Sequence, residues 1–246
     1  GGVFITANRT DPPRGFDPAR SGSSSLISVI APNNGEGNFV TQCRENVYEI
    51  CPAKAESWEV NADSTQFTFK LRDDIYWHDG NKLTVEDMSW WFDLWVNGYK
   101  GTDAKGNEVS RRAGSGAKTI GGIEKTEILD GNRFRITLKE SKPLYLTFLG
   151  QARKQVAHPR HIMQAELAKG NANVSPLNID FLSAGPFKIT EYRKGSHVTL
   201  VRNDNYFEKD AKGRALPYMD GIRFAIIKDA AAMDAAFRTG RLDSTA

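Results

Sequence analysis

Two stretches of alternating apolar and polar residues limit most strongly what this chain can fold into. In the first, residues 57–60 and 67–71 flank a polar turn, and in the second, residues 124–129 and 133–138 flank a turn that contains Gly131. Alternation with a period of two is typical of a strand with one buried face, and a short polar or glycine-containing turn between two such runs indicates a hairpin. The sequence therefore predicts two β-hairpins.

A helix from about residue 85 to residue 96 is predicted between the hairpins. Thr84 precedes Asp87 by three residues, which is the order of a capping box with Asp in place of the usual Glu. Apolar residues then recur at helical spacing, at Met88, Trp91, Phe92 and Trp95. The two hairpins and this helix predict a compact α+β unit.

The remaining segments predict further elements of both kinds. The first 35 residues indicate one strand at 3–7 followed by Pro- and Ser-rich turns, and the aperiodic stretch from 97 to 122 indicates a long surface loop. Helices are expected after Pro143, Pro159 and Asp229, and strands at 187–192, 198–202 and 222–227. The expected fold class is therefore mixed α/β.

Composition and charge exclude several classes of protein. The chain has 246 residues, 39% of them hydrophobic, which is enough for one large or two modest globular domains. Its 33 basic and 30 acidic residues give a net charge of +3, which is too small to indicate nucleic acid as a partner. No stretch reaches the 18 apolar residues of a membrane helix, and residues 1–9 lack the features of an export signal, so we expect any such signal to have been removed.

The chain contains two cysteines, Cys43 and Cys51, which are eight positions apart. We predict a local disulfide between them, worth about 2.5 kcal/mol, and two buried free thiols are the alternative. The cysteines have no further ligands at zinc-site spacing, and His158 and His161 are separated by Pro159 and lack a third ligand. No metal site is predicted.

No arrangement of residues indicates catalysis. The serines at 21–25 and Ser115 lack the GxSxG pattern and a suitably placed His or Asp partner. The acidic pairs 73–74 and 86–87 are explained more simply by a turn and a helix start than by acid–base chemistry, and Gly121-Gly122 opens no phosphate loop. We expect a protein that is not an enzyme and needs no cofactor.

Several segments occur in an order that carries a family resemblance. The most specific block comprises residues 55–60, 67–73, 77–80 and 83–87. Further segments are a G-P-[YF] strand at 184–189, R-N-x-x-Y at 202–207, P-Y-x-D-x-I at 216–222 and G-x-x-D at 238–243. Together they resemble the family-5 extracellular solute-binding proteins, whose members serve peptide, dipeptide and nickel importers.

The resemblance implies a periplasmic-binding-protein-like lobe of type II with a small α+β domain inserted in it. Residues 1–40 and 172–246 would form this first lobe, and residues 41–171 the accessory domain. Similar proteins continue into a second lobe, which we expect to be absent from this sequence, and they enclose a solute at the hinge between the lobes.

The resemblance also implies where a solute would be contacted. In similar proteins the loop after an F/L-D-P element, here residues 16–18, lines the cleft, as does the segment just ahead of Pro159. The predicted contacts are Ser21, Ser25, Leu26, Arg153 and Gln155, with Arg111 and Arg112 as further candidates.

The implied function is that of the substrate-binding component of an ABC importer, which captures di- or oligopeptides and delivers them to a permease in the membrane. An oligosaccharide, an opine or a nickel chelate is the alternative solute, and a non-transport interaction or chaperone-like module is an alternative of another class. We expect a monomer in the periplasm or outside the cell, either free or lipid-anchored to the cytoplasmic membrane.

Overall fold

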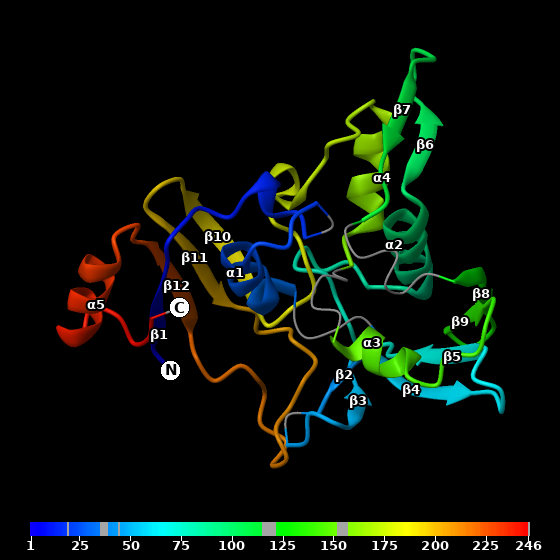
Figure 1. Cartoon of the computed structure of the whole chain (residues 1–246), viewed down its shortest axis with the longest axis horizontal. Helices are drawn as coiled ribbons and strands as arrows, with labels where there is room; N and C mark the ends of the chain where they lie inside the picture. The colour runs from blue at the N-terminus through cyan, green and yellow to red at the C-terminus, as the bar shows by residue number, and fades with distance from the viewer. Residues whose placement is uncertain (19, 35–38, 44, 115–121, 152–156, 246) are drawn as a thin grey trace.

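Two four-stranded sheets organise the chain and lie on opposite sides of the molecule in Figure 1. The structure, a computed structural model, describes residues 1–18, 20–34, 39–43, 45–114, 122–151 and 157–245. None of the helices in these ranges is long and apolar enough to cross a membrane.

The first sheet joins the beginning of the chain to its last third. Its strand order is β1 (Val3–Asn8), β12 (Gly221–Ile226), β11 (His197–Arg202) and β10 (Phe187–Arg193). Strands β1 and β12 run parallel, and the other two pairs are antiparallel. The predicted strands in these regions are confirmed. The helix that follows, α5 (Ala230–Arg238), begins as predicted at Asp229, whose side chain accepts a hydrogen bond from the backbone N–H of Ala232 at 2.7 Å.

The second sheet contains both predicted hairpins. Its order is β4 (Ala55–Val60), β5 (Gln66–Leu71), β9 (Arg133–Leu138) and β8 (Ile123–Leu129), and all pairs are antiparallel. The β8–β9 turn needs left-handed backbone at two successive positions, and Gly131 (φ 63°) and Asn132 (φ 62°) are residue types that accept it. The apolar residues of β5 are buried, and Phe69 and Phe134 both stack on Phe39.

Helix α2 (Val85–Asn97) covers this sheet and forms as predicted. The Thr84 hydroxyl accepts from the Asp87 N–H, and the Asp87 carboxylate accepts from the Thr84 N–H, which completes the capping box. Trp91 and Trp95 are almost fully buried, and they belong to the same core cluster as the apolar residues of the sheet. The helix was predictable because the apolar residues at helical spacing form one face, and that face is the one that meets the sheet.

Residues 24–34, which were expected to be turns, form helix α1 (Ser24–Asn34), so that prediction was wrong. The serine-rich run supplies the helix cap: the Ser23 hydroxyl accepts from the N–H of Leu26 at 3.2 Å. Leu26, Val29 and Ile30 have the i, i+3, i+4 spacing of a helix face and are buried beside β10. The serines that suggested turns therefore mark a helix start.

The predicted long loop after α2 contains a hairpin of β6 (Tyr99–Thr102) and β7 (Glu108–Arg111), which also corrects the sequence interpretation. Its turn is held by the Asp103 carboxylate, which accepts from the backbone N–H groups of Lys105 and Asn107 at 2.9 and 2.8 Å. Each strand has four residues, so the alternation is too short to be recognised from sequence.

The smaller elements complete the fold. A two-stranded ladder of β2 (Val40–Gln42) and β3 (Ile50–Pro52) lies next to a disulfide between Cys43 and Cys51, whose Cα atoms are 5.0 Å apart. The others are the helices α3 (Tyr145–Gln151) and α4 (Arg160–Ala168) and the 3-10 turns η1 (Arg14–Phe16) and η2 (Pro176–Ile179). Both α-helices were predicted.

His78 connects the two sheet regions. Its backbone N–H donates to the Ser183 carbonyl at 2.7 Å, and its ring Nε2 lies 3.1 Å from the Gly185 carbonyl, just ahead of β10. A carbonyl only accepts, so Nε2 carries the proton and the ring donates. Burial lowers the pKa of His78 to about 4, although the Gly185 carbonyl opposes this shift.

We predict that replacing Thr84 by Ala lowers the free energy of unfolding by about 1 kcal/mol, because the first turn of α2 loses its cap. Chemical denaturation measures this change. Thr102→Ala, at an exposed position of β6, is the matched control. Equal effects of the two substitutions would contradict the role of the cap.

His78 predicts a pH dependence of stability. The unfolded ring binds a proton below its ordinary pKa of 6.5, whereas the folded ring stays neutral down to about pH 4. The contribution is therefore fully present above pH 6.5 and is lost as the pH falls from 6.5 towards 4, by up to about 1.4 kcal/mol per pH unit. His78→Gln keeps a donor for Gly185 but does not titrate. We measure the free energy of unfolding by chemical denaturation at several pH values between 7 and 5. This free energy should fall less steeply with decreasing pH in the variant than in the wild type, and an equal dependence on pH would refute the assignment.

Candidate functional site

The turn η1 has an unusual backbone. Arg14, Gly15 and Phe16 all have positive φ, at 55°, 65° and 65°, which costs about 1–3 kcal/mol for each residue other than glycine. A Cβ atom on Gly15 would lie 2.3 Å from the hydroxyl of Ser175, so the turn has no space for a side chain there. The ring of Phe16 is fully buried and packs edge-on against Phe181, which offsets the strain. The turn therefore fixes the direction in which the chain leaves Phe16.

Asp17, the next residue, is the centre of a buried polar cluster. Its carboxylate lies 2.5 Å from Nη2 of Arg111 at the end of β7, and Nη1 of Arg111 donates to the Val174 carbonyl at 2.7 Å. The side chains are 0% and 6% exposed. The ring of His158, also buried, lies 4.0 Å from the other carboxylate oxygen and packs on Trp91. Three distant segments meet at this carboxylate.

The charges of the cluster stabilise one another. Burial alone would raise the pKa of Asp17, but His158 and Arg111 together hold it below its ordinary value. Burial lowers the pKa of His158, and its interaction with Asp17 only partly opposes this shift, so the ring is neutral at neutral pH. Asp17 and Arg111 therefore form the ion pair of the cluster.

A concave surface lies next to this cluster. It has a volume of about 480 Å³ and is formed by η1, the turn after Asp17, the end of β7 and the segment before η2. We call it the basic cavity, and its lining residues are Arg14, Arg20, Ser110, Arg111, Arg112, Ala113, Ala172 and Asn173. Four of these eight residues are arginines, and none of them is acidic.

The structure distributes the predicted contact residues unevenly. Arg112 is exposed in the basic cavity, whereas the guanidinium of Arg111 is bonded to Asp17 and Val174. Leu26 is fully buried in the core beside β10, so its side chain has no accessible surface here, and its contact with a solute stays a prediction. Arg153 and Gln155 lie outside the described residues.

The predicted serines lie at the start of α1. The Ser25 hydroxyl is bonded to Thr10 at 2.9 Å and lies 3.3 Å from Ser23, and Ser25 is 8% exposed. Ser21 is half-buried, and its hydroxyl accepts from the N–H of Ser23 at 3.4 Å. Neither serine lines the basic cavity.

Arg14 and Arg20 were not predicted from the sequence as contact residues. Both side chains are exposed and line the basic cavity, where they extend the positive charge of Arg112. They flank residues 16–18, the segment that had been singled out as the start of a cleft-lining loop. One arginine on each side of that segment was the available sequence signal for a basic site.

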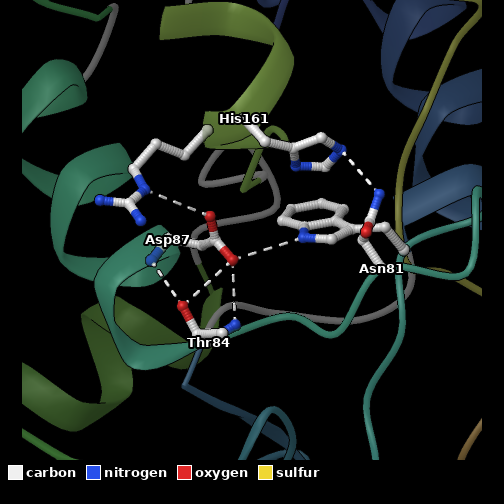
Figure 2. A network of polar contacts seen from close by, with 6 residues as sticks. Asn81, Thr84, Asp87 and His161 are labelled. Carbon is white, nitrogen blue, oxygen red and sulfur yellow. Dashed lines mark hydrogen bonds and ion pairs between the residues drawn. The ribbon is translucent and has the colours of Figure 1, made fainter.

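A second polar network, shown in Figure 2, has a structural role. The Asp87 carboxylate accepts from the N–H and hydroxyl of Thr84, lies 3.5 Å from the indole nitrogen of Trp77, and lies 3.6 Å from Nε of Arg160 on α4. His161 is the next residue of α4, and its ring Nε2 lies 3.4 Å from Nδ2 of Asn81. The network joins α2, α4 and the turn before α2.

A larger cavity, of about 730 Å³, lies between β3 and the segment 207–218. Its lining carries charges of both signs, and several are paired: Arg72 with Asp74 at 2.7 Å, and Asp210 with Arg214 at 2.6 Å. Among the described residues, no group of three or more His, Cys, Asp or Glu side chains is placed to hold a metal ion. The basic cavity is therefore the better candidate for binding a charged ligand.

We predict that Arg111→Met lowers the free energy of unfolding by about 3–5 kcal/mol, because it leaves the Asp17 carboxylate buried without its cation. Chemical denaturation of the variant measures this loss. The neighbouring Arg112→Met is the matched control and should change stability by no more than about 0.5 kcal/mol. In a double-mutant cycle, Asp17→Asn combined with Arg111→Met should cost less than the sum of the single changes. Equal effects of Arg111→Met and Arg112→Met would overturn this assignment.

Comparisons with known proteins agree with the fold. Residues 49–246 match the sequence profile of the bacterial extracellular solute-binding proteins, family 5 Middle. The "Probable ABC transporter-binding protein" of Deinococcus radiodurans is 29% identical over 260 residues, which cover 99% of this chain and 40% of the relative. The "Dipeptide-binding protein DppE" of Bacillus subtilis is 24% identical over 252 residues, which cover 99% of this chain and 43% of the relative.

Solved structures of binding proteins share the same architecture. MoaA from A. tumefaciens R10, in complex with mannopinic acid, superposes with a TM-score of 0.78 at 25% identity, covering 99% of this chain and 44% of that chain. The present chain thus spans about two fifths of the length of the proteins that it matches. The mixed α/β fold is that of a periplasmic-binding-protein lobe, and the family's members are binding proteins. The chain belongs to the bacterial extracellular solute-binding proteins of family 5.

Proposed function

We propose that this chain contributes a solute-binding lobe to the receptor of an ABC importer, located outside the cytoplasmic membrane. Membership of a solute-binding family over residues 49–246 is the observation that carries this proposal. The basic cavity supports it, because a concave surface with converging polar groups is the usual form of a small-molecule site. The receptor would work as a monomer, without a cofactor, and would make or break no bond.

The proposed domains are a first lobe of residues 1–40 and 172–246 and an inserted domain of residues 41–171. All four strands of the first sheet come from the two terminal ranges, and all four strands of the second come from the central range. His78 lies where the two would meet. A lobe assembled in this way would close over a solute by a hinge motion, and the closed form would dock on the permease.

A di- or oligopeptide is the solute that we propose first. The dipeptide-binding protein of B. subtilis aligns with nearly the whole chain, which supports this choice. An opine is the second candidate, since the similar MoaA structure contains mannopinic acid and the basic cavity suits a carboxylate. An oligosaccharide or a nickel chelate, and a non-transport interaction module, are the remaining alternatives.

Thermal unfolding of the natural full-length protein tests the proposal. A solute that binds only the folded protein stabilises it by about 2.7 kcal/mol at one hundred times its Kd, and therefore raises the unfolding midpoint. We expect di- to pentapeptides to raise it, and cello-oligosaccharides and a nickel–histidine chelate to leave it unchanged. A shift with an opine alone would replace the peptide by that solute, and no shift with any solute would contradict the receptor function.

A further inference from the structure

The basic cavity contains positive charge that nothing in the described chain neutralises. Arg111 is paired with Asp17, but no described residue forms an ion pair with Arg14, Arg20 or Arg112. Exposed arginines elsewhere in the structure do have aspartate partners, as in the pairs Arg133–Asp130 at 2.5 Å, Arg202–Asp204 at 2.8 Å and Arg238–Asp234 at 2.8 Å. Three guanidinium groups around one hollow repel each other, and an anion between them would relieve that repulsion.

The backbone around Asp17 sets the positions of these arginines. The N–H of Asp17 donates to the carbonyl of Arg14 at 3.3 Å, and its carbonyl accepts from the N–H of Arg20 at 3.1 Å. Its carboxylate holds Arg111, the last residue of β7, and Arg112 follows directly after it. One buried residue therefore arranges three segments that each carry an exposed arginine.

The strained turn adds to this arrangement. Arg14 is held in a left-handed conformation that a residue with a side chain rarely adopts, and both neighbours keep it there. Gly15 has no room for a side chain beside Ser175, and the ring of Phe16 is buried between Phe181 and Tyr192. Groups fixed before a ligand arrives lose less entropy when it binds.

We infer that Arg14, Arg20 and Arg112 together bind a carboxylate of the solute. This inference rests on the proposed function and narrows it to solutes that present a carboxylate to this lobe. The planar guanidinium donates paired N–H groups that match the two oxygens of a carboxylate, and such charge-assisted bonds are stronger than neutral ones. The carboxylate belongs to a peptide C-terminus, to an acidic side chain or to an opine.

The test is isothermal titration of the natural full-length protein with probes that differ in one carboxylate. Ala-Glu-Ala is compared with Ala-Gln-Ala to test the side chain, and Ala-Ala-Ala with its C-terminal amide to test the terminus. Mannopinic acid is the opine probe. Each probe is titrated into the wild type and into Arg14→Gln, Arg20→Gln and Arg112→Gln. Arg238→Gln on α5, outside the basic cavity, is the matched control.

We expect each cavity variant to weaken binding of the probe with the recognised carboxylate roughly tenfold, and Arg238→Gln to leave it unchanged. The matching probe without that carboxylate should bind the wild type and the variants with the same, lower affinity. Peptides that bind equally well with and without each carboxylate, and equally to wild type and variants, would overturn the inference while leaving the receptor function intact.

The other outcomes separate the two proposals. Arginine-dependent binding of mannopinic acid alone supports the carboxylate site and overturns the peptide assignment. Binding of a carboxylate probe that none of the three cavity variants weakens overturns the site. A failure of every probe to bind overturns the carboxylate site together with the peptide and opine assignments.

Discussion

The buried carboxylate of Asp17 is the interaction on which the arrangement of the candidate site depends. An unpaired carboxylate at 0% exposure would be strongly destabilising, so the folded state keeps Arg111 in contact with it, and Arg111 in turn holds the end of β7 in place. The partners are 94 positions apart in sequence, and the Val174 carbonyl adds a third segment. The cost of leaving this charge unpaired therefore holds η1 and the end of β7 together, and the hydrogen bond from Arg111 to the Val174 carbonyl holds the segment before η2 beside them.

The sequence predicted those parts of the fold in which local signals and packing agree. The alternation at 67–71 and the pair Thr84 and Asp87 predicted a strand and a helix start, because a half-buried strand and a capped helix each carry their signature within a few residues. Helix α1 was missed because the serines that cap it resemble turn residues, and the β6–β7 hairpin was missed because its strands are too short to alternate visibly.

The candidate site was harder to predict than the fold. Family resemblance pointed to the loop after residues 16–18, and the structure does put a cavity beside that loop, but the exposed side chains there are those of Arg14 and Arg20 rather than Leu26. Whether an arginine such as Arg111 serves a buried partner or a surface depends on a contact across 94 residues, which no local pattern encodes. The site residues were therefore harder to predict than the helices and strands, because their exposure depends on ion pairs between distant segments.

The crowding of Gly15 against Ser175 has a consequence for how such a receptor can diversify. A side chain at position 15 would require Ser175 to move, since a Cβ would lie 2.3 Å from the serine hydroxyl, and the φ of 65° would be strained for any residue other than glycine. The exposed positions 20 and 112 do not share this restriction, whereas position 14 shares the positive φ. The side chains at positions 20 and 112 can therefore be exchanged while the turn beside them stays the same, so the charge of the hollow can be changed without a change of fold.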